Sequence, residues 1–187
     1  MSFYLSAISN NLRTALNYSI TDPYEVIVLP RHCGVHKKGT LKLEDVLNSV
    51  KQHPSYSKVG ALAFFIGTVR GESLQGETVK ALELEAYDEK ADETLENICN
   101  NLKAKKGIVD VQIHHFTGKF DLGEDIVYVL VAGEHRKDVF PVLEEAVERY
   151  KKEAPIFKKE YVKGIDGKMK SYWVSEQEKP HAKRKKR

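Results

Sequence analysis

Basic side chains gather at both ends of one predicted helix, where they could bind and activate an anion. His135, Arg136 and Lys137 precede it, and lysines at 151–152 and 158–159 follow it. Unpaired N–H groups and a partial positive charge make a helix N-terminus favourable for anions. Arginine suits phosphate or carboxylate because its planar guanidinium bonds two oxygens at once. A partly buried lysine among other lysines could act as a nucleophile or proton donor. Lysine-rich helix ends are also often just solvated surface, and this alternative stays open.

The helix between these cations is predicted from the residues on either side of it. Residues 126–131 form a continuous apolar run typical of a buried strand, and Gly133 ends it. Asp138 is the expected N-cap, and Pro141 then falls in the first turn, where a missing N–H has no cost. The pair 154–155, Ala-Pro, ends the helix because the residue before a proline disfavours the α region.

The length of this helix separates its two basic ends. Its expected apolar face consists of Phe140, Leu143, Val147 and Tyr150. From Asp138 to about Lys152 the helix should be roughly 20 Å long at 1.5 Å per residue. His135 and Lys151 of one chain should therefore not reach the same small ligand. If both serve one site, two copies must supply its halves, which predicts a symmetric dimer with composite pockets.

The remaining elements predict an α+β domain with a mixed, largely antiparallel sheet. Strands are expected at 24–29, 60–69, 79–87, 109–115, 126–131, 158–162 and 169–174. Helices are expected from Thr40 or Lys42 to 53–54 and from a cap at Asp88 to about 105, the latter with an apolar stripe of Ala91, Leu95, Ile98 and Leu102. Residues 118–125 should form a loop.

Several of these elements carry more specific expectations. The strand at 60–69 is apolar at nearly every residue, which favours burial on both faces. A hairpin with a long loop should join it to the strand at 79–87. The last two strands should form a C-terminal β-hairpin around 164–167, with Trp173 anchoring it to the body. Cys99 adjoins the helix stripe and should be a core thiol.

Composition indicates a soluble globular protein of one domain. The chain has 187 residues, of which 41% are hydrophobic and 30% charged. Its two cysteines do not make a disulfide framework, which favours a reducing compartment and a cytoplasmic localisation. No apolar run approaches the length of a membrane span. Removing the five basic residues at 183–187 from a net charge of +3 leaves −2, so the body is not a basic nucleic-acid binder.

The predicted domain boundaries fall near the two ends. Residues 1–22 are a leader, helical or disordered, because apolar residues between positions 5 and 16 fall at helical spacing. Residues 23–177 form the folded domain. Residues 178–187 form a disordered basic tail. His32, Cys33 and His36 are close enough to suggest a metal site, but no second cluster of ligands accompanies them, and no metal is predicted.

Several motifs together resemble the large, catalytic subunit of molybdopterin synthase. They are Phe-Ile-Gly-Thr-Val-Arg at 65–70, Leu-Glu-Ala-Tyr at 84–87, Glu-His-Arg at 134–136, Lys151, Ala-Pro-Ile-Phe-Lys-Lys-Glu at 154–160, and Trp173. The resemblance covers about residues 24–177. It implies an α/β hammerhead-like fold and a central homodimer in which each subunit binds a small ubiquitin-like sulfur carrier, giving a heterotetramer.

The resemblance also implies a reaction in molybdenum cofactor biosynthesis. Such a sulfurtransferase takes sulfur from the C-terminal Gly-Gly thiocarboxylate of its carrier and converts cyclic pyranopterin monophosphate to molybdopterin, without a metal or redox cofactor. By the same resemblance, Lys151 and Lys158 are catalytic. The implied substrate contacts are Thr68, Val69, Arg70, His135, Arg136, Lys151, Lys158, Lys159 and Glu160.

Two departures and two competing functions qualify this interpretation. Val147 stands where the family pattern has a larger flexible residue, and Gln177 stands where some members have arginine, so it is open whether Gln177 replaces an anion contact to the partner chain. One alternative function is a non-catalytic adaptor that binds a ubiquitin-like protein through a rim of lysines. The other is a nucleic-acid binder that uses the basic tail.

Overall fold

The computed structural model describes residues 18–22, 25–28, 32–164 and 167–174. The predicted basic tail, Gln177 and the helical spacing at positions 5–16 of the leader lie outside these residues. Among the described helices, none is long and apolar enough to span a membrane.

Along the described chain, groups of two or three strands are separated by helices. The strands are β1 (Tyr18–Asp22), β2 (Glu25–Val28), β3 (Gly34–Lys37), β4 (Ala61–Thr68), β5 (Thr78–Ala86), β6 (Ile108–Phe120), β7 (Asp125–Gly133), β8 (Ile156–Lys163) and β9 (Met169–Val174). The helices are α2 (Leu43–Lys51), α3 (Asp88–Lys103) and α4 (Arg136–Glu153), with a short 3-10 helix at Tyr56–Lys58.

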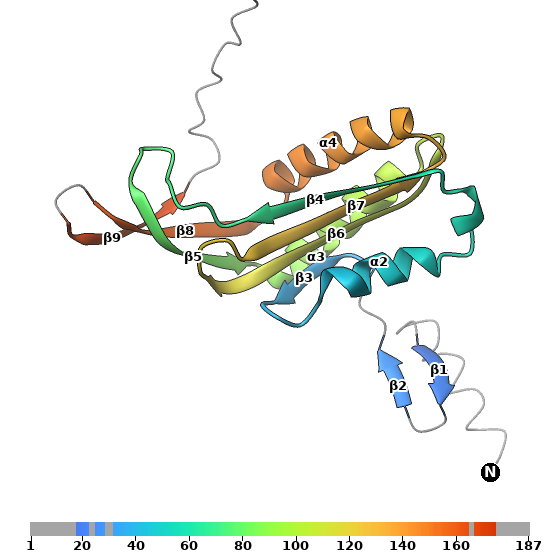
Figure 1. The fold of residues 1–187 in the computed structure, drawn as a ribbon, viewed down its shortest axis with the longest axis horizontal. Coiled ribbons are helices and arrows are strands. Elements are labelled where there is room, and N and C mark those ends of the chain that lie inside the picture. The colour runs from blue at the N-terminus through green and yellow to red at the C-terminus, as the bar shows by residue number, and fades with distance from the viewer. Residues whose placement is uncertain (1–17, 23–24, 29–31, 165–166, 175–187) are drawn as a thin grey trace, which may run out of the picture.

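One mixed sheet organises the fold and confirms the α+β prediction. Its strand order is β4-β7-β6-β5-β8-β9, and β3 pairs in parallel with β6, while the neighbours along that path are antiparallel. Figure 1 shows α4 and α2 on opposite sides of the central strands, and β5, β8 and β9 extending beyond them at one end. The predicted C-terminal hairpin is confirmed as the antiparallel pair β8–β9.

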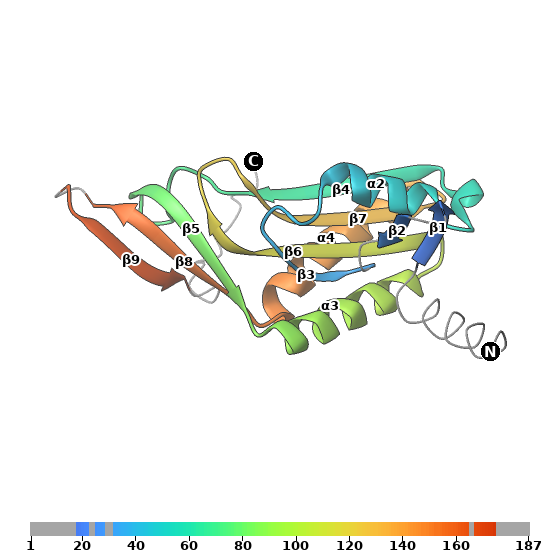
Figure 2. The ribbon, with the colours of Figure 1, turned by 90° about the horizontal axis from the view of Figure 1, so that it is seen from below.

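Two hydrophobic cores lie on the two faces of this sheet. Figure 2 shows α2 on one side of the strands and α3 on the other. Strand β7 contributes to both. Val127, Val129 and Val131 pack in the core with α3 and α4, whereas Leu130 and Ala132 pack in the core with α2. Because alternate side chains of a strand point to opposite faces, this explains why residues 126–131 are apolar without interruption.

Helix α3 agrees closely with its sequence prediction. Its four predicted stripe residues are fully buried, and so is Cys99, which confirms the predicted core thiol. The helix begins at Asp88, with Tyr87 as its N-cap, one residue before the predicted cap. Helix α2 has Lys42 as its N-cap, one of the two predicted starts.

Helix α4 begins earlier than predicted, and this changes its buried face. Its N-cap is His135, whose carbonyl oxygen accepts hydrogen bonds from the backbone N–H groups of Asp138 and Val139. Asp138 is therefore inside the helix, and Pro141 lies in the second turn rather than the first. Phe140, predicted to be buried, is 59% exposed. The buried face consists of Val139, Val142, Ala146, Val147 and Tyr150.

Three predictions about strands are wrong. Strand β4 lies at the edge of the sheet and is only partly buried, because β7 is its only partner along the described chain. It does not form a hairpin with β5, which pairs with β6 and β8. Strand β6 continues to Phe120 through the predicted loop, with Gly118 at a φ of 128° that favours glycine.

The exposure of Trp173 in the C-terminal hairpin and the structure of residues 18–22 also differ from expectation. Trp173 is 52% exposed, and Lys159 lies over its ring, so it does not anchor the hairpin to the body. Residues Tyr18–Asp22, at the end of the predicted leader, form β1 and pair antiparallel with β2. The helical spacing ends at position 16, before this strand begins.

Candidate functional site

A cavity of about 350 Å³ opens where the C-terminal end of α4 meets the sheet. Strands β4, β6, β7, β5, β8 and β9 all contribute to its lining. The lining residues are Phe65, Ile66, Gly67, Thr68, Arg70, Leu74, Leu84, His115, Ile126, Val127, Tyr150, Lys151, Ala154, Ile156, Lys158 and Val174. The cavity thus brings together six segments that are separated in the sequence.

One row across the sheet forms part of the cavity lining. His115 of β6 pairs with Val127 of β7, which pairs in turn with Gly67 of β4. A Cβ atom on Gly67 would lie 2.6 Å from Cγ1 of Val127. Because such a contact is much shorter than van der Waals distance, only glycine fits here without moving the lining.

Replacing Gly67 with alanine should lower the free energy of unfolding by about 1–3 kcal/mol, the usual cost of overpacking. Urea denaturation of the wild type and the variant measures this difference. Gly71→Ala is the matched control, because a Cβ atom there would come no closer than 3.9 Å to Leu122. Equal stability of the two variants would contradict the tight packing of Gly67.

Three cationic side chains line this cavity from three elements. Lys151, in the last turn of α4, has its Nζ 5.5 Å from the centre of the Phe65 ring. Lys158 of β8 has its Nζ 3.0 Å from Oε1 of the buried Glu160. Arg70 follows the end of β4 and is exposed. Lysine and arginine only donate hydrogen bonds, so the cavity favours an anionic ligand.

Val69 and Lys159 adjoin lining residues in the sequence but do not line this cavity. The side chain of Val69 is buried in the core that contains α2. Lys159 points to the other face of β8, where its Nζ lies 5.4 Å from the ring centres of Tyr161 and Trp173. Thr68, Arg70, Lys151 and Lys158 line it, with Glu160 paired to Lys158.

His135 and Arg136 lie at the opposite end of α4 and are exposed. The helix has 18 residues, which corresponds to about 27 Å at 1.5 Å per residue. Neither residue lines the cavity that contains Lys151. The sequence argument that one chain cannot bring both basic ends to one small ligand therefore agrees with the geometry.

His115 lines the cavity, although sequence reasoning did not select it. It is 5% exposed, and its ring packs edge-on against Tyr150 at 5.7 Å. Burial lowers the pKa of His115 to about 4, so the ring is neutral near pH 7. A signal was present in the sequence, because His115 occupies the same alternating face as Val111 and Ile113 of the core.

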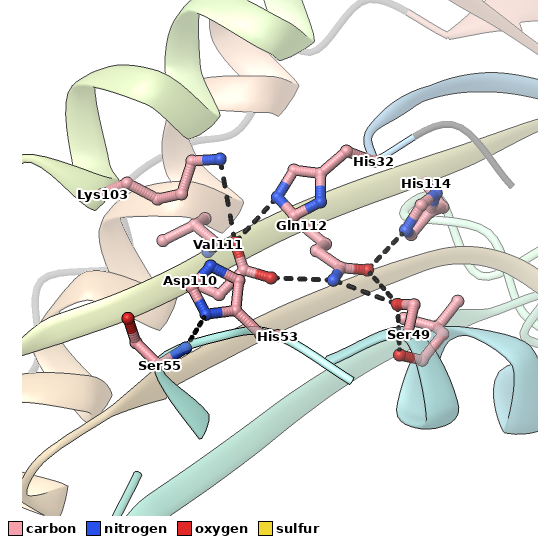
Figure 3. A network of polar contacts seen from close by, with 10 residues as sticks. His32, Ser49, His53, Ser55, Lys103, Asp110, Val111, Gln112 and His114 are labelled. Atoms are coloured by element: carbon pink, nitrogen blue, oxygen red, sulfur yellow. Dashed lines mark hydrogen bonds and ion pairs between the residues drawn. The ribbon is translucent and has the colours of Figure 1, made fainter. Parts of the chain in front are cut away.

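A second polar cluster lies on the other face of β6, around the buried Asp110 (Figure 3). Oδ1 of Asp110 is 2.7 Å from Nε2 of His32 and 3.7 Å from Nζ of Lys103, and Oδ2 accepts a hydrogen bond from Gln112 at 2.8 Å. Burial opposes ionisation of Asp110, but the hydrogen bond and charge of His32, helped by Gln112 and Lys103, lower its pKa. The cluster joins the segment before β3 to the sheet.

His32, Cys33 and His36, whose spacing in the sequence suggests a metal site, have other partners in the structure. His32 contacts Asp110, Nε2 of His36 is 3.0 Å from Nδ1 of His114, and Cys33 packs against the core that contains Cys99. Within the described part of the chain, no group of three metal-ligating side chains is found. This second cluster is polar scaffolding in the described structure, whereas the cavity at the end of α4 has the chemistry of a binding site.

Comparison with known proteins gives consistent matches. A family model described as "MoaE protein" matches residues 35–153. The chain is 39% identical over 119 residues to the "Probable molybdopterin synthase" of Haloferax volcanii, a match that covers 63% of this chain and 46% of that protein. It is 38% identical over 106 residues to the "Molybdopterin synthase catalytic subunit" of Pyrococcus abyssi, covering 57% and 71% of the two chains.

A solved structure shares the fold. The crystal structure of molybdopterin synthase from Staphylococcus aureus aligns with a TM-score of 0.66 at 27% identity, covering 78% of this chain and 98% of that chain. The family match includes Arg70, His135 and Lys151, whereas Lys158 lies beyond its end. This chain thus spans less than half the length of the Haloferax protein but nearly the whole of the aligned Staphylococcus chain.

Proposed function

The chain belongs to the MoaE protein family, and from this premise we propose that it is the catalytic subunit of a molybdopterin synthase. In this proposal it transfers sulfur from the C-terminal thiocarboxylate of a small ubiquitin-like carrier to cyclic pyranopterin monophosphate. The reaction belongs to molybdenum cofactor biosynthesis and uses no metal or redox cofactor. The two free thiols, Cys33 and Cys99, are in keeping with a reducing cytoplasm.

The observation that carries this proposal is the convergence of Arg70, Lys151 and Lys158 on one cavity. The two lysines meet an incoming thiocarboxylate, offset its negative charge and orient its sulfur toward the pterin. Sulfur bonds to the pterin while water replaces it on the acyl carbon of the carrier, which leaves as an ordinary carboxylate, and a lysine ammonium can donate a proton to the opening ring. Arg70, at the edge of the cavity, binds the phosphorylated pterin.

Glu160 has a supporting role in this proposal. It is buried, and its carboxylate lies 3.0 Å from the Nζ atom of Lys158 and 3.4 Å from the hydroxyl oxygen of Tyr172. A carboxylate fixed in this way holds the Lys158 ammonium in one position, because leaving a buried charge without its oppositely charged partner is strongly destabilising. Lys158 therefore faces its ligand already oriented by Glu160.

The phosphate end of the pterin requires a second copy of the chain. His135 and Arg136 begin α4, and Lys151 lies in its last turn, so one helix separates them. A two-fold dimer can bring the N-terminal end of α4 in one copy to the cavity of its mate. Exposed N–H groups and Arg136 at a helix N-terminus then bind the phosphate. With one carrier on each copy, the assembly is a heterotetramer.

Reconstitution tests the proposed function directly. The purified chain is mixed with thiocarboxylated carrier and cyclic pyranopterin monophosphate, and the dithiolene product is assayed. Formation of molybdopterin at a rate dependent on the chain supports the proposal. Tight binding of the carrier without pterin binding or product would instead identify a non-catalytic adaptor, and would overturn it.

Replacing Arg136 with alanine should raise the KM for the cyclic pterin by about 10- to 100-fold, the range expected for loss of a charge-assisted bidentate contact. The rate at saturating pterin should change much less, because the sulfur-transferring lysines stay in place. Steady-state kinetics with varied pterin measures this. Lys137→Ala is the control, since it removes a neighbouring exposed cation. An unchanged KM would exclude Arg136 from the site.

A further inference from the structure

His115 differs from the cationic side chains that line the cavity. Arg70, Lys151 and Lys158 can only donate hydrogen bonds. His115 lies on β6, and Val127 is paired with it on the neighbouring strand. The centre of the Tyr150 ring lies 5.7 Å from the centre of the His115 ring. His115 is therefore a fixed group whose hydrogen-bonding role can be deduced from its contacts.

The contacts of His115 determine which ring nitrogen carries the proton. Nδ1 lies 3.1 Å from the carbonyl oxygen of Phe116, and a carbonyl oxygen can only accept a hydrogen bond. Nδ1–H must therefore be the donor. Because burial keeps the ring neutral, Nε2 has a free lone pair and is an acceptor. Among the described residues, no hydrogen bond to Nε2 is found.

A peptide tail that enters this cavity presents two kinds of group. Its terminal anion and carbonyl oxygens accept hydrogen bonds, and the cations satisfy them. Its backbone N–H groups need acceptors, and each one buried without a partner costs binding free energy. The lining otherwise consists largely of apolar side chains, such as Phe65, Ile66 and Val127.

We propose that His115 recognises the carrier tail by accepting a hydrogen bond at Nε2 from one backbone N–H of the tail's last residues. This inference rests on the proposed function and adds a residue that recognises the peptide backbone of the sulfur donor. A free sulfide or a small thiol has no amide N–H, so His115 favours a peptide thiocarboxylate over such donors.

Two variants of matched shape test the role of His115. His115→Phe keeps a planar ring without an acceptor, and His115→Gln places an amide oxygen near the position of Nε2. The Phe variant should raise the KM for thiocarboxylated carrier by about 10-fold, as expected for one lost hydrogen bond, with kcat and the pterin KM little changed. The Gln variant should recover most of this loss, a rescue that a merely structural role would not give.

Carriers with a single N-methyl group on one of the last three peptide bonds provide an independent test on the wild-type chain. One of these carriers should bind about 10-fold more weakly to the wild type, and that penalty should largely disappear with His115→Phe. Equal penalties in both proteins, or a Phe variant that loses kcat instead of carrier affinity, would overturn the inference. If the wild type made no molybdopterin at all, the proposed function would fail instead.

Discussion

Replacing Lys151 with alanine should reduce the rate of molybdopterin formation by at least about 10³-fold, because it removes both a proton donor and a cation beside the reacting sulfur. Lys151 is half-buried over the Phe65 ring, in the cavity where the carrier tail is proposed to end. The chain should remain folded, since the side chain lies outside both hydrophobic cores. Single-turnover assays with saturating carrier and pterin measure the loss.

Lys152→Ala is the matched control for this variant. Lys152 is the next residue of α4, is exposed, and does not line the cavity. Its replacement should leave the rate within about twofold of the wild type, as is usual for a surface substitution. Near-normal turnover by Lys151→Ala would show that the assigned role is wrong, whatever the control does.

Mixing the Lys151→Ala and Arg136→Ala variants, both of which should turn over slowly at low pterin, tests the composite site that this role requires. A heterodimer of Lys151→Ala and Arg136→Ala chains has one site with both changes and one with neither. After exchange of subunits at equal amounts, activity at low pterin should recover to about one quarter of the wild type, because half the dimers then hold one intact site. No recovery would mean that both residues serve the site from the same chain.

Acidification should destabilise this protein strongly between pH 7 and pH 5. Burial, followed by the nearby His36 and His32, lowers the pKa of His114 to about 3, and burial lowers the pKa of His115 to about 4. In the unfolded chain both rings bind protons below about pH 6.5, whereas in the folded chain they stay neutral. At pH 5 each of these two rings should therefore lower the free energy of unfolding by about 2 kcal/mol, or by about 4 kcal/mol together.

Urea denaturation at pH 7.5, 6 and 5 measures this loss. Proton uptake on unfolding at pH 5 should be near two per chain from these rings, and it should vanish at pH 8. Asp110 does not contribute in this window, because its lowered pKa stabilises the fold down to about pH 4 and its effect is lost only below that. Replacing His114 with glutamine should halve the pH-dependent drop, even if it also lowers stability at pH 7.5. A flat stability curve between pH 7.5 and pH 5 is incompatible with two neutral buried histidines.

The sequence was most informative where a local pattern alone decides the structure. The stripe in α3, the apolar alternation of β7 and the β8–β9 hairpin follow from side-chain periodicity and turn residues. The family resemblance, which the comparisons confirm, implies Arg70, Lys151 and Lys158 as site residues, and all three line the cavity. Their meeting in one cavity could not have been derived from spacing.

The predictions failed where position in the sheet decides the outcome. The apolar run at 60–69 fits a central strand and an edge strand equally well, and only the pairing with β7 distinguishes them. Asp138 is a good cap by residue type, but His135 already had the extended backbone that starts the helix. Val69 and Thr68 are neighbours in one motif, yet one enters a core and the other the cavity, as expected for alternating residues at a strand end.

The two adjacent histidines of β6 point to opposite faces of the sheet and lie in different sites. His114 belongs to the polar cluster facing α2, and His115 lines the cavity beside α4. Inserting or deleting one residue upstream within this strand would exchange their faces, since the side-chain period is two. Evolution can therefore substitute residues along β6 but has little freedom to change its length, whereas the loop between β4 and β5 can lengthen without disturbing either histidine.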